Sequence, residues 1–203
     1  MGVVGLRGFG AHAARHLCRA AATVPALARA RVCVWPGATP EAAAELEADF
    51  GSDAAGSSAS SRVLISVGSA AQVGMHSDVV LLWVESTPHW ARALLQLLPG
   101  LRPGCLVVAC ALSDPPAILR KWAACLALQR VALVDAAFTG SASAARGATL
   151  TALVGGSEAN VARVRPLLNL FASRIVHAGK VVMDSKTIRH CEDTSRDVNI
   201  YML

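Results

Sequence analysis

Short apolar runs alternate with segments of helical periodicity along most of this chain. The apolar runs are bounded by Gly, Pro, Asp or Ser, and they predict strands at residues 3–6, 31–35, 63–67, 79–84, 105–110, 132–134, 149–154 and 174–177. Helical patterns between them predict helices at residues 11–22, 40–50, 88–98, 115–128 and 158–172. This alternation is typical of α/β proteins, so we expect a doubly wound, mainly parallel sheet with helices on both faces.

The pattern also predicts how the chain divides. Residues 1–179 carry all the predicted strands and helices and are expected to form one domain. Residues 51–61 are rich in Gly, Ser and Ala and are expected to form an exposed loop. From residue 180 to residue 203 the apolar periodicity fades, which predicts an irregular C-terminal tail.

A glycine bend joins the first predicted strand to the first predicted helix. Its residues, Gly8-Phe9-Gly10-Ala11-His12-Ala13, have the spacing of the dinucleotide fingerprint G-x-G-x-x-G/A. In this alignment Gly8 permits the tight turn, Gly10 lets the backbone approach a pyrophosphate, and Ala13 lets the helix pack on the strand. The helix N-terminus offers free N–H groups and partial positive charge to a phosphate. The bend therefore predicts a Rossmann-type domain that binds a dinucleotide.

Composition supports one globular domain and argues against nucleic acid and membranes as its partners. The 203 residues are 54% hydrophobic and 16% charged, which is enough for one sizeable core. The net charge of +5 is spread along the chain without a run of Lys or Arg, so we do not expect nucleic-acid binding. No apolar run approaches the roughly 20 residues that cross a bilayer, so we expect no membrane association.

The cysteines and the N-terminal region bear on the cellular compartment. The six cysteines include no C-x-x-C pair and mostly lie in apolar runs, so we expect reduced, buried thiols. The first 40 residues contain five arginines and no acid, as organellar transit peptides do. The same residues also encode the first strand and the bend, so we expect a cytoplasmic protein, with the organellar matrix as the alternative.

Four segments, in order, carry a family resemblance. They are Val4-Gly-Leu-Arg-Gly-Phe-Gly10, Ser77-Asp-Val-Val-Leu-Leu82, Leu101-Arg-Pro-Gly-Cys-Leu-Val-Val108 and residues 134–150, followed by Val154-Gly-Gly156 and Arg165-Pro-Leu-Leu168. The block Asp135-Ala-Ala-Phe-Thr-Gly-Ser141 with Thr149-Leu150 is similar to the family's D-A-P-V-S-G-G…G-T-L segment. Over residues 2–179 the chain resembles the N-terminal cofactor domain of the β-hydroxyacid dehydrogenases, which include 3-hydroxyisobutyrate and L-threonate dehydrogenases and are related to 6-phosphogluconate dehydrogenase.

This resemblance implies NAD or NADP as the cofactor and a small β-hydroxy acid as the substrate. In the family a hydride passes between the hydroxy acid and the nicotinamide. The resemblance implies a substrate-carboxylate site at Thr139, Gly140 and Ser141. It implies cofactor contacts from Gly8, Phe9, Gly10, Ala11, His12, Ala13, Val84, Glu85 and Leu112.

The chain also departs from the family pattern. Ala109-Cys110-Ala111-Leu112 replaces a D-x-S-T motif, so hydroxyl groups that position the nicotinamide are absent. Trp35-Pro36-Gly37 replaces the acid or arginine that would distinguish NAD from NADP. Ile188 takes the place of the catalytic lysine, and Lys186 lies about 200° away on a helix.

Because no K-x-x-N motif and no helical second domain follow in this sequence, no catalytic residue is assigned. Two hypotheses remain. The chain is either the NAD(P)-binding domain of a β-hydroxyacid dehydrogenase-like oxidoreductase, or a non-catalytic nucleotide-binding or assembly module with the same fold. Without the helical domain we expect exposed apolar surface and weak self-association.

Other polar residues have both structural and functional interpretations. His12 either contacts a phosphate or points into solvent, and Glu85 is either a ligand-binding residue at a strand end or a solvated loop acid. Asp135 is expected to order the turn after it. His16 and His177 have no partners at metal-ligand spacing, so no metal site is predicted.

Overall fold

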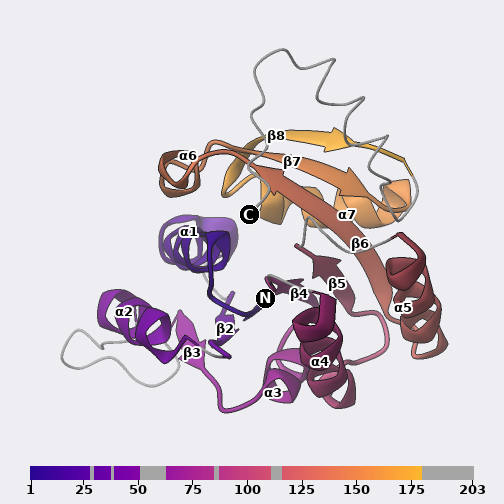
Figure 1. The fold of residues 1–203 in the computed structure, drawn as a ribbon. Helices are drawn as coiled ribbons and strands as arrows, with labels where there is room; N and C mark the ends of the chain where they lie inside the picture. The colour runs from indigo at the N-terminus through magenta and orange to yellow at the C-terminus, as the bar shows by residue number, and fades with distance from the viewer. Residues whose placement is uncertain (28–29, 38, 51–62, 85–86, 111–115, 180–203) are drawn as a thin grey trace.

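The computed structural model describes residues 1–27, 30–37, 39–50, 63–84, 87–110 and 116–179. In these residues eight strands form one sheet in the order β3-β2-β1-β4-β5-β6-β7-β8 (Figure 1). The strands are β1 (Gly2–Val4), β2 (Val32–Trp35), β3 (Leu64–Ser66), β4 (Val79–Leu82), β5 (Leu106–Ala109), β6 (Ala132–Thr139), β7 (Leu150–Gly155) and β8 (Ala172–His177). All neighbours pair in parallel except β6 and β7, which are antiparallel.

Helices connect the strands and cover both faces of the sheet (Figure 1). The α-helices are α1 (Phe9–Thr23), α2 (Pro40–Phe50), α3 (Ala70–Met75), α4 (Thr87–Leu97), α5 (Pro116–Leu128), α6 (Ala142–Arg146) and α7 (Glu158–Leu168). Short 3-10 helices, η1 (Pro25–Leu27) and η3 (Leu98–Gly100), follow α1 and α4. The predicted α/β class with a mainly parallel, doubly wound sheet is therefore confirmed.

The strand side chains divide between two cores because successive residues of a strand point to opposite faces. On β1, Val3 packs with buried side chains of α1, α2, α6 and α7. Its neighbour Val4 packs with those of α3, α4 and α5. Aliphatic residues fill most of both cores, and aromatic rings are concentrated in two small groups.

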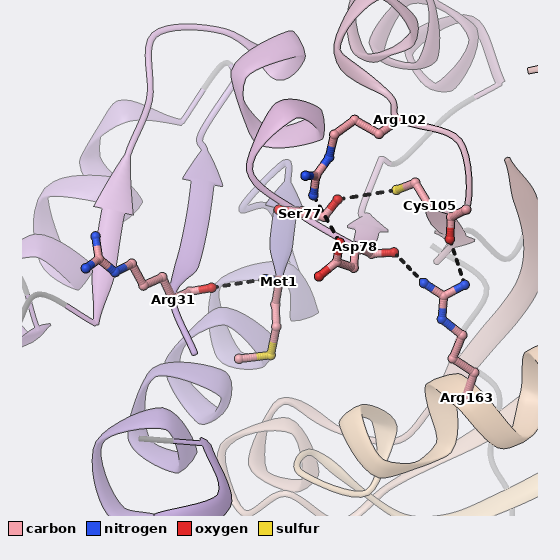
Figure 2. A network of polar contacts seen from close by, with 8 residues as sticks. Met1, Arg31, Ser77, Asp78, Arg102, Cys105 and Arg163 are labelled. Carbon is pink, nitrogen blue, oxygen red and sulfur yellow. Dashed lines mark hydrogen bonds and ion pairs between the residues drawn. The ribbon is translucent and has the colours of Figure 1, made fainter. Parts of the chain in front are cut away.

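A network of polar contacts ties together the amino ends of the strands (Figure 2). The Arg163 guanidinium of α7 donates to the carbonyl of Gly104 at 2.8 Å and to that of Asp78 at 3.2 Å. Arg102 donates to the Asp78 carboxylate at 3.0 Å. These contacts anchor the loops before β4 and β5 and hold the amino edge of the sheet together.

Some elements differ from the sequence-based predictions. The strand predicted to end at residue 134 continues to Thr139, because β7 pairs with its second half. The helix predicted to reach residue 172 ends at Leu168, and β8 begins at Ala172. The short helices α3 and α6 were not predicted. The predicted loop at residues 51–61 and the predicted tail at residues 180–203 lie outside the described residues.

Candidate functional site

The carboxyl ends of the central strands lie side by side at one edge of the sheet. Val4 of β1 pairs with Trp35 of β2 on one side and with Leu82 of β4 on the other, and Leu82 pairs with Ala109 of β5. The chain leaves β1 toward β2 and β3 and then crosses to β4, so strand order reverses between β1 and β4. In open α/β sheets ligands bind outside the carboxyl ends at such a switch point.

The bend after β1 is shaped by two glycines that touch the end of β4. Gly5 has φ +84°, and a Cβ there would lie far inside van der Waals contact with the carbonyl oxygen of Trp83. A Cβ on Gly10 would lie 2.6 Å from the carbonyl oxygen of Gly5 and 3.0 Å from Cβ of Trp83. Gly5 therefore makes the tight turn, and Gly10 lets α1 pack closely on the sheet.

This geometry changes the alignment of the fingerprint. The sequence assigned the tight turn to Gly8 and the close phosphate approach to Gly10. In the structure Gly5 and Gly10 have the roles of the first and third glycines of G-x-G-x-x-G, which are five residues apart. The second position, where the backbone comes closest to the pyrophosphate, is then Arg7, an exposed residue.

Gly8 has a different environment from the other two glycines. It is exposed and precedes α1 with φ +53° and ψ −122°, and a Cβ there would have no heavy atom within 4 Å among the described residues. No side chain caps the helix at this position, and the first turn of α1 contains no acidic residue. Among the described residues, the start of this 15-residue helix therefore has open space beside Gly8 and neither a capping side chain nor a first-turn acid to offset its partial positive charge.

Aromatic rings join the bend to two other predicted site segments. Phe9, the first residue of α1, makes an edge contact with Trp83 at a ring-centroid distance of 6.4 Å. Trp83 in turn packs against Phe138 at 4.8 Å. Phe138 directly precedes the predicted substrate turn, so one buried indole holds the bend, the end of β4 and the end of β6 together. Sequence reasoning did not single out Gly5, Arg7 or this role of Trp83.

The predicted substrate turn lies where β6 passes into α6. Thr139 is buried, Gly140 has φ +144°, and the hydroxyl oxygen of Ser141 accepts a hydrogen bond from the N–H of Ala144 at 3.1 Å. Helix α6 packs against α1, where His16 Nε2 contacts the carbonyl of Ala145 at 2.9 Å. The turn and the bend are therefore held on neighbouring helices.

His12 lies one helical turn before His16 and is half-buried. Burial, followed by the positive charges of Arg146 and Arg15 and by His16, lowers the pKa of His12 below its usual value. An anion bound near the start of α1 would therefore meet a positive environment. Ala11 is also half-buried, whereas Ala13 is buried against the sheet.

The remaining predicted residues fall partly outside the described structure. Val84 follows β4 and is half-buried, whereas Glu85 and Leu112 lie outside the described residues. Cys110 directly follows β5, and its buried thiol donates to the carbonyl of Val108 at 3.5 Å. That thiol is turned back toward β5, and burial raises its pKa well above the usual range.

The cysteines of the described residues are free. Cys18, Cys33, Cys105 and Cys110 are buried as expected, but Cys125 on α5 is exposed. Across the ranges that the structure covers, no helix is long and apolar enough to cross a membrane. No group of three or more His, Cys, Asp or Glu in those ranges could hold a metal ion.

A doubly wound sheet with a glycine bend at its switch point defines a Rossmann-type dinucleotide-binding domain. Comparison with family models identifies which one. Residues 1–179 match the NAD binding domain of 6-phosphogluconate dehydrogenase, and the chain belongs to that family.

Individual relatives are consistent with this assignment. The chain is 32% identical over 106 residues to an NAD-dependent L-serine dehydrogenase of Pseudomonas aeruginosa, covering 51% of this chain and 35% of that protein. It resembles the fold of Mycobacterium tuberculosis 3-hydroxyisobutyrate dehydrogenase with L-serine at a TM-score of 0.74 and 22% identity, covering 96% of this chain and 59% of that one. An imine reductase variant from Myxococcus stipitatus in complex with NAD⁺ matches with a TM-score of 0.72, 17% identity and coverage of 96% and 60%. The chain thus spans about 60% of the solved relatives.

Proposed function

We propose that this domain binds NAD or NADP with the pyrophosphate at the N-terminus of α1. The observation that carries the proposal is the open, uncapped helix start at Gly8, set at the switch point between β1 and β4. Its N–H groups and helix dipole suit a diphosphate. In this arrangement the adenosine lies over the end of β2 and the nicotinamide extends toward β5 and β6.

The end of β2 bears on the choice between the two cofactors. Trp35 and Pro36 are half-buried, Gly37 is exposed, and none of the three carries a charge. An acid here would bind the ribose 2′-hydroxyl of NAD, and an arginine would bind the 2′-phosphate of NADP. These three residues therefore favour neither cofactor, and we propose that the domain accepts both.

The turn Thr139-Gly140-Ser141 is proposed to bind the carboxylate of a small β-hydroxy acid. The hydroxyl oxygen of Ser141 already accepts a hydrogen bond within α6, but its proton remains available to donate. L-serine, which accompanies the Mycobacterium tuberculosis 3-hydroxyisobutyrate dehydrogenase in its solved structure, is such an acid and supports this class of substrate.

Hydride transfer is proposed for the complete protein of which such a domain forms part. The bound nicotinamide supplies the hydride chemistry. The described residues hold the two reactants, through the bend at the start of α1 and the turn after β6. We assign no catalytic residue to this chain, because Ile188 stands at the position of the family's lysine and lies outside the described residues.

The competing proposal is a nucleotide-binding module without turnover. The end of β5 supports it. Ala109 and Cys110 stand where the family has the first residues of its D-x-S-T motif, and the thiol of Cys110 is directed at Val108. These two residues therefore offer no side-chain hydrogen bond to a nicotinamide at this strand end.

Calorimetric titration with NADH and NADPH tests the binding proposal, and a pair of variants locates the site. Gly8→Asp places a carboxylate in the open space beside the helix start and is expected to abolish binding, since it repels the phosphates. Gly104→Asp is the matched control, because Gly104 is also exposed with positive φ and open space but lies at the amino edge. If both variants bind the cofactor equally well, the proposed position of the site beside Gly8 is wrong. If the unaltered chain releases no heat with NADH or NADPH, the proposal that it binds these cofactors is wrong.

Turnover separates the two proposals. Formation of NADH or NADPH from L-serine or another small β-hydroxy acid would support the oxidoreductase. Tight cofactor binding with no turnover of any small β-hydroxy acid would support the module.

A further inference from the structure

The second position of the fingerprint holds an arginine where a glycine normally gives a phosphate room. Gly5 and Gly10 fix this alignment through their contacts with Trp83 and with each other. The carbonyl of Arg7 accepts the N–H of Gly10 at 3.0 Å, so the backbone of Arg7 is part of the turn that starts α1. Its exposed side chain therefore begins at the mouth of the proposed phosphate site.

Two consequences of this arginine are physically possible. Its side chain could obstruct the pyrophosphate, or its guanidinium could bind it. Gly8 favours binding over obstruction. This residue directly follows Arg7, and it has the open space that the second glycine of the fingerprint usually provides. The backbone can still approach a phosphate closely, one residue further along, without displacing the arginine.

Charge also favours binding. The first turn of α1 has no acidic residue that would oppose a phosphate. The helix start alone supplies roughly half an elementary charge. A guanidinium adds positive charge and a planar set of donors that matches phosphate oxygens.

We propose that Arg7 binds the pyrophosphate of the dinucleotide directly through its guanidinium, while Gly8 provides the close backbone approach. The proposal rests on the proposed cofactor binding at this bend. It assigns to this chain a side-chain contact at a place where the G-x-G-x-x-G fingerprint uses backbone alone. Affinity should therefore depend on salt more strongly than in a loop with glycine at this position.

The test is calorimetric titration of the unaltered chain, Arg7→Gly, Arg7→Gln and Arg7→Lys with NADH, NADPH and ADP-ribose. Loss of a charged hydrogen bond predicts an affinity lower by about 10-fold or more for Gly and Gln, with Lys intermediate. Arg19→Gln is the matched control, because Arg19 is an exposed arginine on the same helix, three turns from the bend. It should leave the affinity unchanged, and circular dichroism should show the same fold for all variants.

Two further readouts separate phosphate binding from a structural role. Raising the salt concentration should weaken binding to the unaltered chain more than binding to Arg7→Gly, and the affinity for adenosine should not differ between them. An Arg7→Gly variant that binds as tightly as the unaltered chain, or more tightly, overturns this inference while leaving cofactor binding intact. If no form of the chain binds NADH, NADPH or ADP-ribose, the proposed function fails as well.

Discussion

Replacing Gly5 by alanine tests whether the contact between the bend and the end of β4 determines the shape of the site. The added Cβ would fall much closer than 3.0 Å to the carbonyl oxygen of Trp83, and real Cβ atoms essentially never lie within that distance. The two segments must separate by about 1 Å to relieve the overlap. Such a shift strains the hydrogen bond from the N–H of Trp83 to the carbonyl of Val4, which is 2.9 Å long.

Gly104→Ala is the control for the stability loss expected of Gly5→Ala. The φ of Gly104, +87°, nearly equals the +84° of Gly5, but a Cβ there would have no heavy atom within 4 Å. Both substitutions incur about 1–2 kcal/mol for an L-residue in the left-handed region. Both also reduce the freedom of the unfolded chain by the same amount. The difference between Gly5→Ala and Gly104→Ala therefore isolates the overlap, which we expect to cost a further 1–3 kcal/mol, roughly the cost of overpacking.

Urea denaturation followed by tryptophan fluorescence and circular dichroism measures this difference. With a urea m-value of about 2 kcal/mol/M, an extra 2 kcal/mol lowers the midpoint of Gly5→Ala by about 1 M relative to Gly104→Ala. Equal midpoints would refute the reasoning, since they would show that the end of β4 yields to the new methyl group without cost.

Three further outcomes follow from single residues. Ala148 has φ +58°, so Ala148→Gly should raise the free energy of unfolding by about 0.5–1 kcal/mol and the urea midpoint with it. A lower midpoint would contradict this. Burial and the charge of Arg146 lower the pKa of His12, so its titration by NMR should have a midpoint below 6.5, and Arg146→Gln should raise it. Because the pKa is lower in the folded state, the stability that the neutral imidazole contributes is complete above pH 6.5 and decreases as the pH falls. Iodoacetamide at pH 8 should modify exposed Cys125 long before Cys18, whose pKa burial raises to about 12, and equal rates measured by mass spectrometry would exclude the described burial.

The strands of the central sheet could be predicted because buried parallel strands read as short apolar runs between turn residues. Helix α3 escaped prediction, although its cap can be recognised in the sequence. The hydroxyl of Ser69 accepts from the N–H of Gln72 at 3.4 Å, and the side chain of Gln72 accepts from the N–H of Gly68 at 2.9 Å. A helix of six residues is too short to show a clear period, so only this S-x-x-Q pattern marks it.

The glycine alignment could not be settled from the sequence because two frames fit. Gly8 and Gly10 with Ala13 satisfy the fingerprint in one frame, and Gly5 with Gly10 satisfies its outer positions in the other. Which glycine is needed for close packing depends on Trp83, more than 70 residues away in the chain. Sequence spacing carries no information about that contact.

Trp83 explains why the glycine bend and the turn after β6 form one unit. Its backbone carbonyl excludes any side chain at Gly5, and its indole packs on Phe138 beside the turn. At Gly10 the carbonyl of Gly5 excludes a side chain, and the side chain of Trp83 lies tightly against the same position. The indole N–H is buried and has no hydrogen-bond partner among the described residues, which costs about 1–3 kcal/mol. Aromatic contacts of about 0.5–1.5 kcal/mol each, made with Phe9, Phe138 and Phe171, offset that cost. Trp83 therefore links the bend and the turn through its contacts with Phe9 and Phe138.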